Sequence, residues 1–178
     1  MDTLSEREIL QIESSVIFFT ASAPLEAHGH VNVSPKGMKD TFTIIDSSTV
    51  AYLDLTGSGA ETAAHVAQNQ RITLMWCSFG ERPNILRLFG KGKLHTAASE
   101  SFARLLPLFG AHLGCRGIFE VAIERISNTC GFGVPIASDM FEREDLDAWL
   151  EKKGENGLRE YQLRKNSVSI DGLTAYPS

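Results

Sequence analysis

The sequence predicts a mainly β fold, an antiparallel barrel of six to seven strands with short peripheral helices. Three observations predict it: short runs of β-branched and aromatic residues recur, few residues separate them, and only brief stretches have helical spacing. A β-sandwich would give a similar strand count, and periodicity alone does not separate the two. With 178 residues and 43% hydrophobic content, we expect one compact fold.

The chain begins with the pattern of a short helix followed by a hairpin. Residues 6–15 carry Ile9, Leu10 and Ile12 among charged side chains, which is typical of an amphipathic helix. Residues 16–20 have the composition of a buried strand. A turn at 26–29 leads into residues 30–34, whose alternation predicts a strand with one buried face.

Strands and helices then alternate along the rest of the chain. Runs of β-forming residues predict strands at 41–45, 49–55, 71–77, 85–94 and 118–126. Helical spacing of apolar residues predicts helices at 61–69, 99–109 and 144–153. A glycine-rich loop at 130–135 separates the last strand from the last helix.

Charge and cysteine content exclude several classes of protein. The formal charge of -5, with 22 acidic and 17 basic residues, would repel nucleic acid. The apolar stretch 16–23 is far shorter than the roughly 20 residues of a membrane span, and no signal peptide precedes it. The 3 cysteines lie far apart without a C-x-x-C motif, so we expect neither a disulfide framework nor a zinc site. A cytoplasmic location is expected.

Four segments in a fixed order resemble those of one protein family: 18–25 (FFTASAPL), 30–37 (HVNVSPKG), 52–62 (YLDLTGSGAET) and 85–92 (ILRLFGKG). Together they resemble the pyridoxamine 5'-phosphate oxidase-like family of FMN-binding split β-barrels. Residues 130–135 (CGFGVP) and 165–173 (KNSVSIDGL) are similar to the tail of an uncharacterised oxidase branch of that family. The resemblance covers nearly the whole chain. It implies a split barrel at 1–130, with 131–178 as a loop and helical extension packed on the same domain.

The resemblance also implies a homodimer with FMN in a groove lined by both subunits. The strands around 32–36 and 50–56 would edge the flavin, the helix opened by Ser58 would face its phosphate, and the strand beginning at Arg71 would add contacts. The implied cofactor-binding residues are Asn32, Val33, Ser34, Lys36, Asp54, Thr56, Ser58, Gly59, Thr62, Arg71, Thr73 and Arg87.

Chemistry supports a phosphate site but also offers alternatives. The turn from Thr56 to Gly59 before a helix presents backbone amides to an anion, yet Ser58 and Glu61 also have the spacing of a capping box, which would use those amides. A lysine of the pyridoxamine phosphate oxidases, nine residues before the arginine matching Arg71, corresponds here to Thr62. Lys36 is the expected replacement cation; the alternative is a solvated surface lysine.

Other polar and aromatic residues leave two interpretations each. Arg87 lies in an apolar run, so its charge needs either the flavin or a carboxylate such as Asp54 or Glu120. Asp54 could orient a ring N–H of the flavin or merely close its strand. The aromatic residues of predicted elements, Trp76 among them, are expected in the core, whereas Phe132 lies in a loop and could contact a ligand.

The histidines suggest no metal centre. His28 and His30 flank a turn without a third ligand at matching spacing, so we expect an exposed turn and no metal. His65 and His112 could each serve as an axial haem ligand, but no other motif supports this.

The expected function is an FMN-dependent oxidoreductase that transfers a hydride or electrons through flavin N5 to or from a small molecule. Because the flavin carries the chemistry, no catalytic residue is identified. NADH or NADPH is a candidate donor. The alternative is a non-catalytic flavin- or haem-binding protein. Pyridoxamine phosphate oxidase activity itself is not expected, because Thr62 and the different tail alter both phosphate sites of that enzyme.

Overall fold

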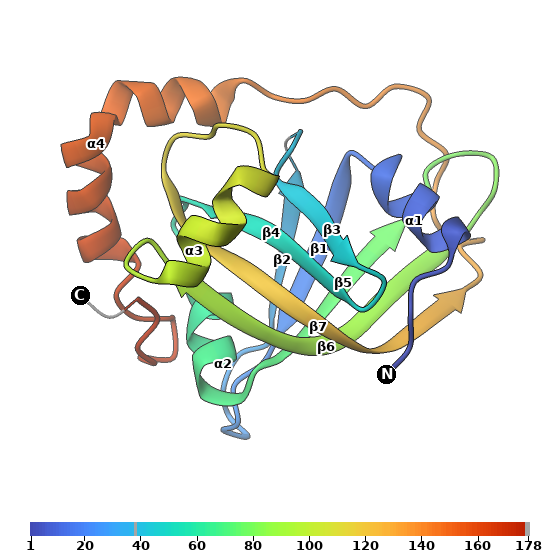
Figure 1. Cartoon of the computed structure of the whole chain (residues 1–178), viewed down its shortest axis with the longest axis horizontal. Helices are drawn as coiled ribbons and strands as arrows, with labels where there is room; N and C mark the ends of the chain where they lie inside the picture. The colour runs from blue at the N-terminus through green and yellow to red at the C-terminus, as the bar shows by residue number, and fades with distance from the viewer. Residues whose placement is uncertain (38, 177–178) are drawn as a thin grey trace.

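A single curved sheet of seven antiparallel strands forms the body of the protein (Figure 1). The computed structural model describes residues 1–37 and 39–176. Its strands run in the order β2-β1-β5-β6-β7-β4-β3. Their bounds are β1 Ile17–Ser22, β2 Asn32–Gly37, β3 Phe42–Asp46, β4 Thr49–Leu55, β5 Arg71–Cys77, β6 Ile85–Thr96 and β7 Cys115–Thr129. The predicted split barrel is confirmed, and one continuous sheet excludes the sandwich alternative for the described residues.

Four helices surround the sheet: α1 Glu6–Glu13, α2 Glu61–Asn69, α3 Glu100–Leu105 with a 3-10 turn at Leu106–Leu108, and α4 Asp145–Lys165. The sequence predicts α2 to the residue but ends α4 at residue 153. Gly154, at φ 63°, breaks α4 there, and a second helical stretch continues to Lys165. This second stretch was missed because few of its residues are apolar.

The inner face of the sheet holds an aromatic core. Phe18 stacks on Trp76 at 5.5 Å between ring centroids, and Tyr52 stacks on Phe119 at 5.0 Å. Strand alternation produces this core, because every second residue of β1 and β5 points inward and is buried. Trp76 therefore lies in the core, as its strand position predicts. Phe132, by contrast, is exposed on its loop.

The outer face of the same strands leaves apolar side chains exposed. Ala21 pairs with Val33 of β2 and Thr73 of β5, and Thr73 pairs with Phe89 of β6, so all four share one face. Val33 is 60% exposed and Phe89 is 38% exposed. This outer sheet face ends at β2, which has no further strand partner in the described sheet.

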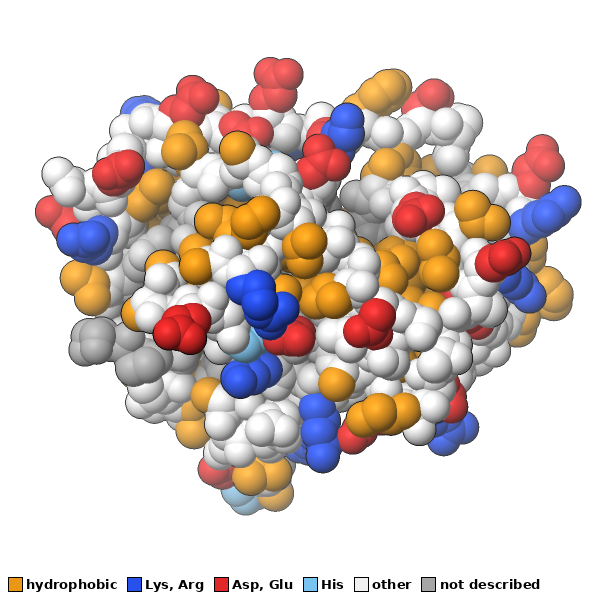
Figure 2. All heavy atoms as spheres, viewed as in Figure 1, with side chains coloured by type: hydrophobic (Ala, Val, Ile, Leu, Met, Phe, Trp, Pro, Cys, Tyr) orange, Lys and Arg blue, Asp and Glu red, His pale blue; other side chains and the backbone are white. Residues whose placement is uncertain are grey.

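No helix in the described part of the chain combines the length and apolar character needed to cross a membrane. On the face shown in Figure 2, acidic and basic side chains are interspersed rather than gathered into a field of one sign.

A substitution at Gly90 tests how closely β6 packs against β7. A β-bulge shifts the register between Phe89 and Gly90, and a Cβ at Gly90 would collide with the carbonyl of Ala122. We expect Gly90→Ala to lower the free energy of unfolding by about 1–3 kcal/mol. Gly133→Ala is the matched control, because a Cβ there meets nothing within 4 Å. Urea titration measures both, and equal small effects would contradict the close approach.

Candidate functional site

The turn between β4 and α2 is held by residues from distant parts of the chain. The Thr56 amide donates to the Gly114 carbonyl at 2.9 Å, and the Gln162 side-chain amide donates to the Thr56 hydroxyl at 2.7 Å. The Asn166 side chain donates to the Gly57 carbonyl at 2.8 Å. These bonds fix the backbone that leads into α2, so the helix start has a defined position.

The start of α2 differs from both expectations for Ser58. The N-cap is Ala60, so Ser58 neither opens the helix nor forms a capping box with Glu61. Instead, the Glu61 carboxylate accepts from the Ala60 amide at 3.0 Å and from the Ile170 amide at 3.2 Å. The capping-box interpretation is wrong because the helix begins two residues later than that motif requires.

A buried carboxylate, Asp54, is the centre of the site. Its side chain is 4% exposed and lies 3.0 Å from the Arg116 guanidinium and 3.4 Å from the Lys36 ammonium. The Tyr176 hydroxyl also donates to it. Burial by itself would raise the pKa of Asp54, but the charges of Arg116 and Lys36 and the Tyr176 hydrogen bond outweigh burial and lower this pKa. Asp54 is therefore ionised and does more than end its strand.

Arg116 is the functional residue that the sequence reasoning missed. A register shift pairs Asp54 with Gly117 but Leu55 with Cys115, which leaves Arg116 as an extra residue in a β-bulge. Such a bulge re-aims one side chain. The Arg116 side chain is 6% exposed, it donates to the Gly59 carbonyl at 2.8 Å, and its Nε has no partner among the described residues. The sequence signal that could have identified Arg116 is a single charged residue directly before the apolar run at 117–119.

These groups line a polar cavity of about 260 Å³. It contains two cations, Lys36 and Arg116, and two carboxylates, Asp54 and Glu61. The first-turn amides of α2, which have no partner within the helix, lie beside it. The cavity thus offers positive charge and amide donors to an anion, balanced by two fixed negative charges.

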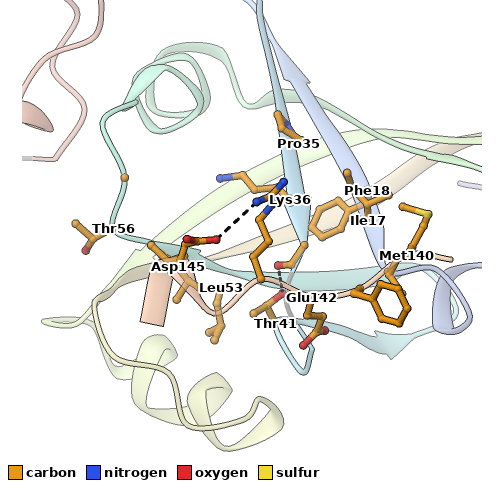
Figure 3. Close-up of a pocket in the computed structure, with 17 residues that line it drawn as sticks. Ile17, Phe18, Pro35, Lys36, Thr41, Leu53, Thr56, Met140, Glu142 and Asp145 are labelled. Atoms are coloured by element: carbon orange, nitrogen blue, oxygen red, sulfur yellow. Dashed lines mark hydrogen bonds and ion pairs between the residues drawn. The ribbon is translucent and has the colours of Figure 1, made fainter. Parts of the chain in front are cut away.

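A second, mostly apolar cavity of about 560 Å³ adjoins the first. The two share four lining residues, Pro35, Lys36, Leu55 and Gly57. Figure 3 shows side chains of Phe18, Lys36 and Leu53 around this cavity, with Met140 and Glu142 from the segment before α4 at its side. A ligand with a flat apolar part and an anionic end could therefore extend from one cavity into the other.

The structure brings most of the sequence-predicted site residues together. Asn32 donates to the Thr62 hydroxyl at 3.0 Å and accepts from Ser34 at 3.2 Å. Thr56 lines the apolar cavity, and Ser58 lies in the turn that borders both. Residues that line the polar cavity directly are Ser34, Lys36, Asp54, Gly59 and Thr62.

The remaining predicted residues lie elsewhere, on the outer sheet face. Val33 points outward from β2, and Arg71 and Thr73 border a separate cavity of about 400 Å³ there. Arg87, also on this side, donates to the Thr129 hydroxyl at 3.0 Å. The two carboxylates considered as its partners are engaged elsewhere, Asp54 with Arg116 and Glu120 with His95. Within one chain, these residues do not join the polar cavity.

Three of the histidines considered as ligands, His30, His65 and His112, have partners within the chain. His30 contacts Asp171 at 2.6 Å, and His65 is buried against Ser22 at 2.9 Å. Burial lowers the pKa of His65. His112 contacts the Lys39 carbonyl at 3.0 Å. No group of three or more His, Cys, Asp or Glu side chains that could hold a metal occurs in residues 1–37 and 39–176.

The barrel, the helix after β4 and the paired cavities define a split-barrel protein with a polar site beside an apolar one. Residues 6–130 match the family described as Pyridoxamine 5'-phosphate oxidase. The chain belongs to this family, and the resemblance noted in the sequence is confirmed.

Similar proteins agree with this assignment. A protein of Aspergillus flavus, described as pyridoxamine 5'-phosphate oxidase family protein ustO, is 37% identical over 173 residues, which cover 88% of this chain and 69% of that protein. Among solved structures, HupZ of Group A Streptococcus has a TM-score of 0.54 at 20% identity, covering 70% of this chain and 98% of HupZ. A FAD-binding protein from Mesorhizobium loti has a TM-score of 0.50 at 14% identity, covering 71% and 94%. These two structures support the fold.

The ionised state of Asp54 can be tested by pH. Asp54→Asn leaves Arg116 buried without its counter-charge, so we expect a loss of about 3 kcal/mol in the free energy of unfolding at neutral pH. Because the folded protein lowers the pKa of Asp54, its stabilisation is complete above the ordinary value of 3.8 and is lost as pH falls below it.

The difference between wild type and Asp54→Asn should therefore shrink as the pH falls from neutral to below the ordinary pKa of Asp54, measured by urea titration at each pH. Asp139→Asn, at an exposed position, is the control and should show no such dependence. A difference for Asp54→Asn that stays constant with pH would mean that folding does not shift the pKa of Asp54.

Proposed function

We propose that the chain binds FMN and acts as an oxidoreductase on a small molecule. The observation that carries this proposal is the buried Arg116, which lines a polar cavity joined to a larger apolar one and whose Nε has no partner among the described residues. A buried guanidinium with an unused donor suits an anionic ligand. The residues present therefore fit a phosphorylated flavin, although the family lysine is replaced by Thr62.

Each part of the cavities has a role in this proposal. Arg116, Lys36 and the first-turn amides of α2 would hold the phosphate. The apolar cavity and the free backbone edge of β2 would hold the flavin ring and orient it. When bound, FMN supplies hydride or electron transfer at N5. The Lys36 ammonium, which lines both cavities, would place positive charge between ring and phosphate.

A homodimer would explain the predicted residues that the single chain leaves apart. The outer sheet face carries exposed Val33 and Phe89 together with Arg71, Thr73 and Arg87. An exposed apolar face rimmed by charge is typical of a protein interface. We infer that this face packs on a second copy and brings these polar residues near the flavin held by that copy.

The family and its relatives support a flavin over other cofactors. One neighbour of similar fold is described as FAD-binding, and the family model matched here is that of a phosphate-ester oxidase. We do not assign pyridoxamine phosphate oxidase activity, because Glu61 and Thr62 occupy the helix start. The alternative function is a flavin- or haem-binding protein without turnover.

Purification with added cofactor separates these functions. Flavin absorption bands that bleach with NADH or NADPH would support the oxidoreductase, and bands that persist with both donors would favour a carrier. A strong Soret band would indicate haem instead.

We also propose a cytoplasmic location, which suits the free cysteines Cys77, Cys115 and Cys130. We assign residues 1–130 to the barrel domain and residues 131–178 to an extension packed on the same domain.

Lys36 provides the first test of the FMN site. Charge-assisted hydrogen bonds contribute about 1.5–3 kcal/mol, so Lys36→Ala should weaken FMN binding about tenfold or more. Quenching of flavin fluorescence measures the Kd. Lys39→Ala is the control, because Lys39 is exposed and lines neither of the two cavities. Unchanged affinity in Lys36→Ala would remove this residue from the site.

The dimer proposal is tested on the outer sheet face. A carboxylate at Val33 would be buried in the interface, so Val33→Asp should convert the dimer to a monomer and weaken FMN binding with it. Analytical ultracentrifugation measures the mass. Leu163→Asp changes an exposed apolar residue of α4 and should leave the mass unchanged. A monomeric wild type would contradict the proposal.

A further inference from the structure

We propose that residues 166–176 make this site select FMN over FAD. This inference rests on the proposed FMN site and names the segment that would exclude the larger flavin. The segment would form the wall beyond the phosphate, so that a flavin ending in one phosphate fits and a flavin that continues through a second phosphate does not. Residues 166–176 lie outside the part of the chain that matches the family, residues 6–130.

The segment is fastened to the site at four places. The Asn166 side chain donates to the Gly57 carbonyl, and the Ile170 amide donates to Glu61. Asp171 contacts His30 just before β2, and Tyr176 donates to Asp54. Gly57, Glu61 and Asp54 line the polar cavity, and His30 precedes β2, which carries further lining residues. Figure 1 shows the segment beside α2, at the end of the barrel where the helix begins.

The segment is also compact in itself, so it can act as a wall. The Ala175 amide donates to the Ser167 carbonyl at 3.0 Å, and the Ser169 amide donates to the Leu173 carbonyl at 2.8 Å. Gly172, at φ 75°, turns the chain between them. Ala175 and Ser169 are buried. These bonds hold Tyr176 in place at the polar cavity.

Tyr176 is the residue of the segment that faces the ligand site. It lines the polar cavity, and the Arg116 guanidinium lies 5.1 Å from its ring centroid. Burial and the neighbouring Asp54 raise the pKa of Tyr176 well above its ordinary value, so its hydroxyl stays protonated and donates. The ring therefore closes the cavity on the side where Arg116 and Asp54 meet.

Size and charge both favour a single phosphate. The polar cavity, at about 260 Å³, is less than half the size of the adjoining apolar cavity at about 560 Å³ and is lined by Tyr176, so we assign it to one phosphate. Its two cations and two carboxylates balance. A second phosphate would add negative charge beside Glu61, whose carboxylate is held in place by the Ile170 amide.

Binding of FMN, FAD and riboflavin to the full chain tests the inference, with flavin fluorescence as the readout. We expect the wild type to bind FMN at least about tenfold more tightly than FAD, a difference of about 1.4 kcal/mol. Tyr176→Ala should open the wall and reduce this preference about tenfold. Tyr176→Phe keeps the ring and should keep the preference. Tyr161→Ala removes a tyrosine of α4 that lines neither cavity and should also keep it.

A second variant keeps the inference testable if Tyr176→Ala does not fold. His30→Ala removes the contact to Asp171 at an exposed side chain, so it loosens the segment without emptying the core. It should shift the preference toward FAD in the same direction.

Each outcome is decisive. Equal affinity of the wild type for FMN and FAD would overturn this inference while leaving a flavin site in place. A preference for FMN that neither Tyr176→Ala nor His30→Ala reduces would also overturn it, because the segment would not cause the selection. If no flavin binds at all, the proposed function fails as well, which separates that failure from the other two.

Discussion

The buried ion pair between Asp54 and Arg116 is the interaction on which the candidate site depends. Two charges removed from water are costly unless each has partners, and here Lys36, Tyr176 and the Gly59 carbonyl supply them. The pair joins β4 to β7 and fixes the turn before α2 through the same guanidinium. The barrel positions the cavity, and the ion pair holds the Arg116 guanidinium in its wall.

The charges of the cavity come from several elements. Glu61 adds a negative charge in the first turn of α2, beside Thr62. Arg116 supplies a cation to the same cavity from β7, and Lys36 supplies one from β2. Both cations of the cavity therefore come from strands and not from the helix.

Local patterns predicted most of the fold and about half of the site. The sequence locates β4, α2 and β5 to the residue, because their alternation or helical spacing is complete within each run. It also selects Lys36 and Asp54, which do meet. Arg116 and Tyr176 could not be predicted, because a register shift aims the first and a contact across 122 residues places the second. Arg71 was expected beside Lys36 and Asp54 from the resemblance, and Arg87 from its charge in an apolar run. Strand pairing places both arginines on the opposite face of the sheet from the cavity.

The β-bulge at Arg116 has a consequence for how such proteins diverge. A bulge is one additional residue in one strand, so its loss by deletion of a single codon would restore regular pairing between β4 and β7 and leave the sheet intact. The guanidinium would disappear from the cavity in the same event. The lining of this cavity can therefore change through strand length, by loss of an inserted residue rather than by substitution.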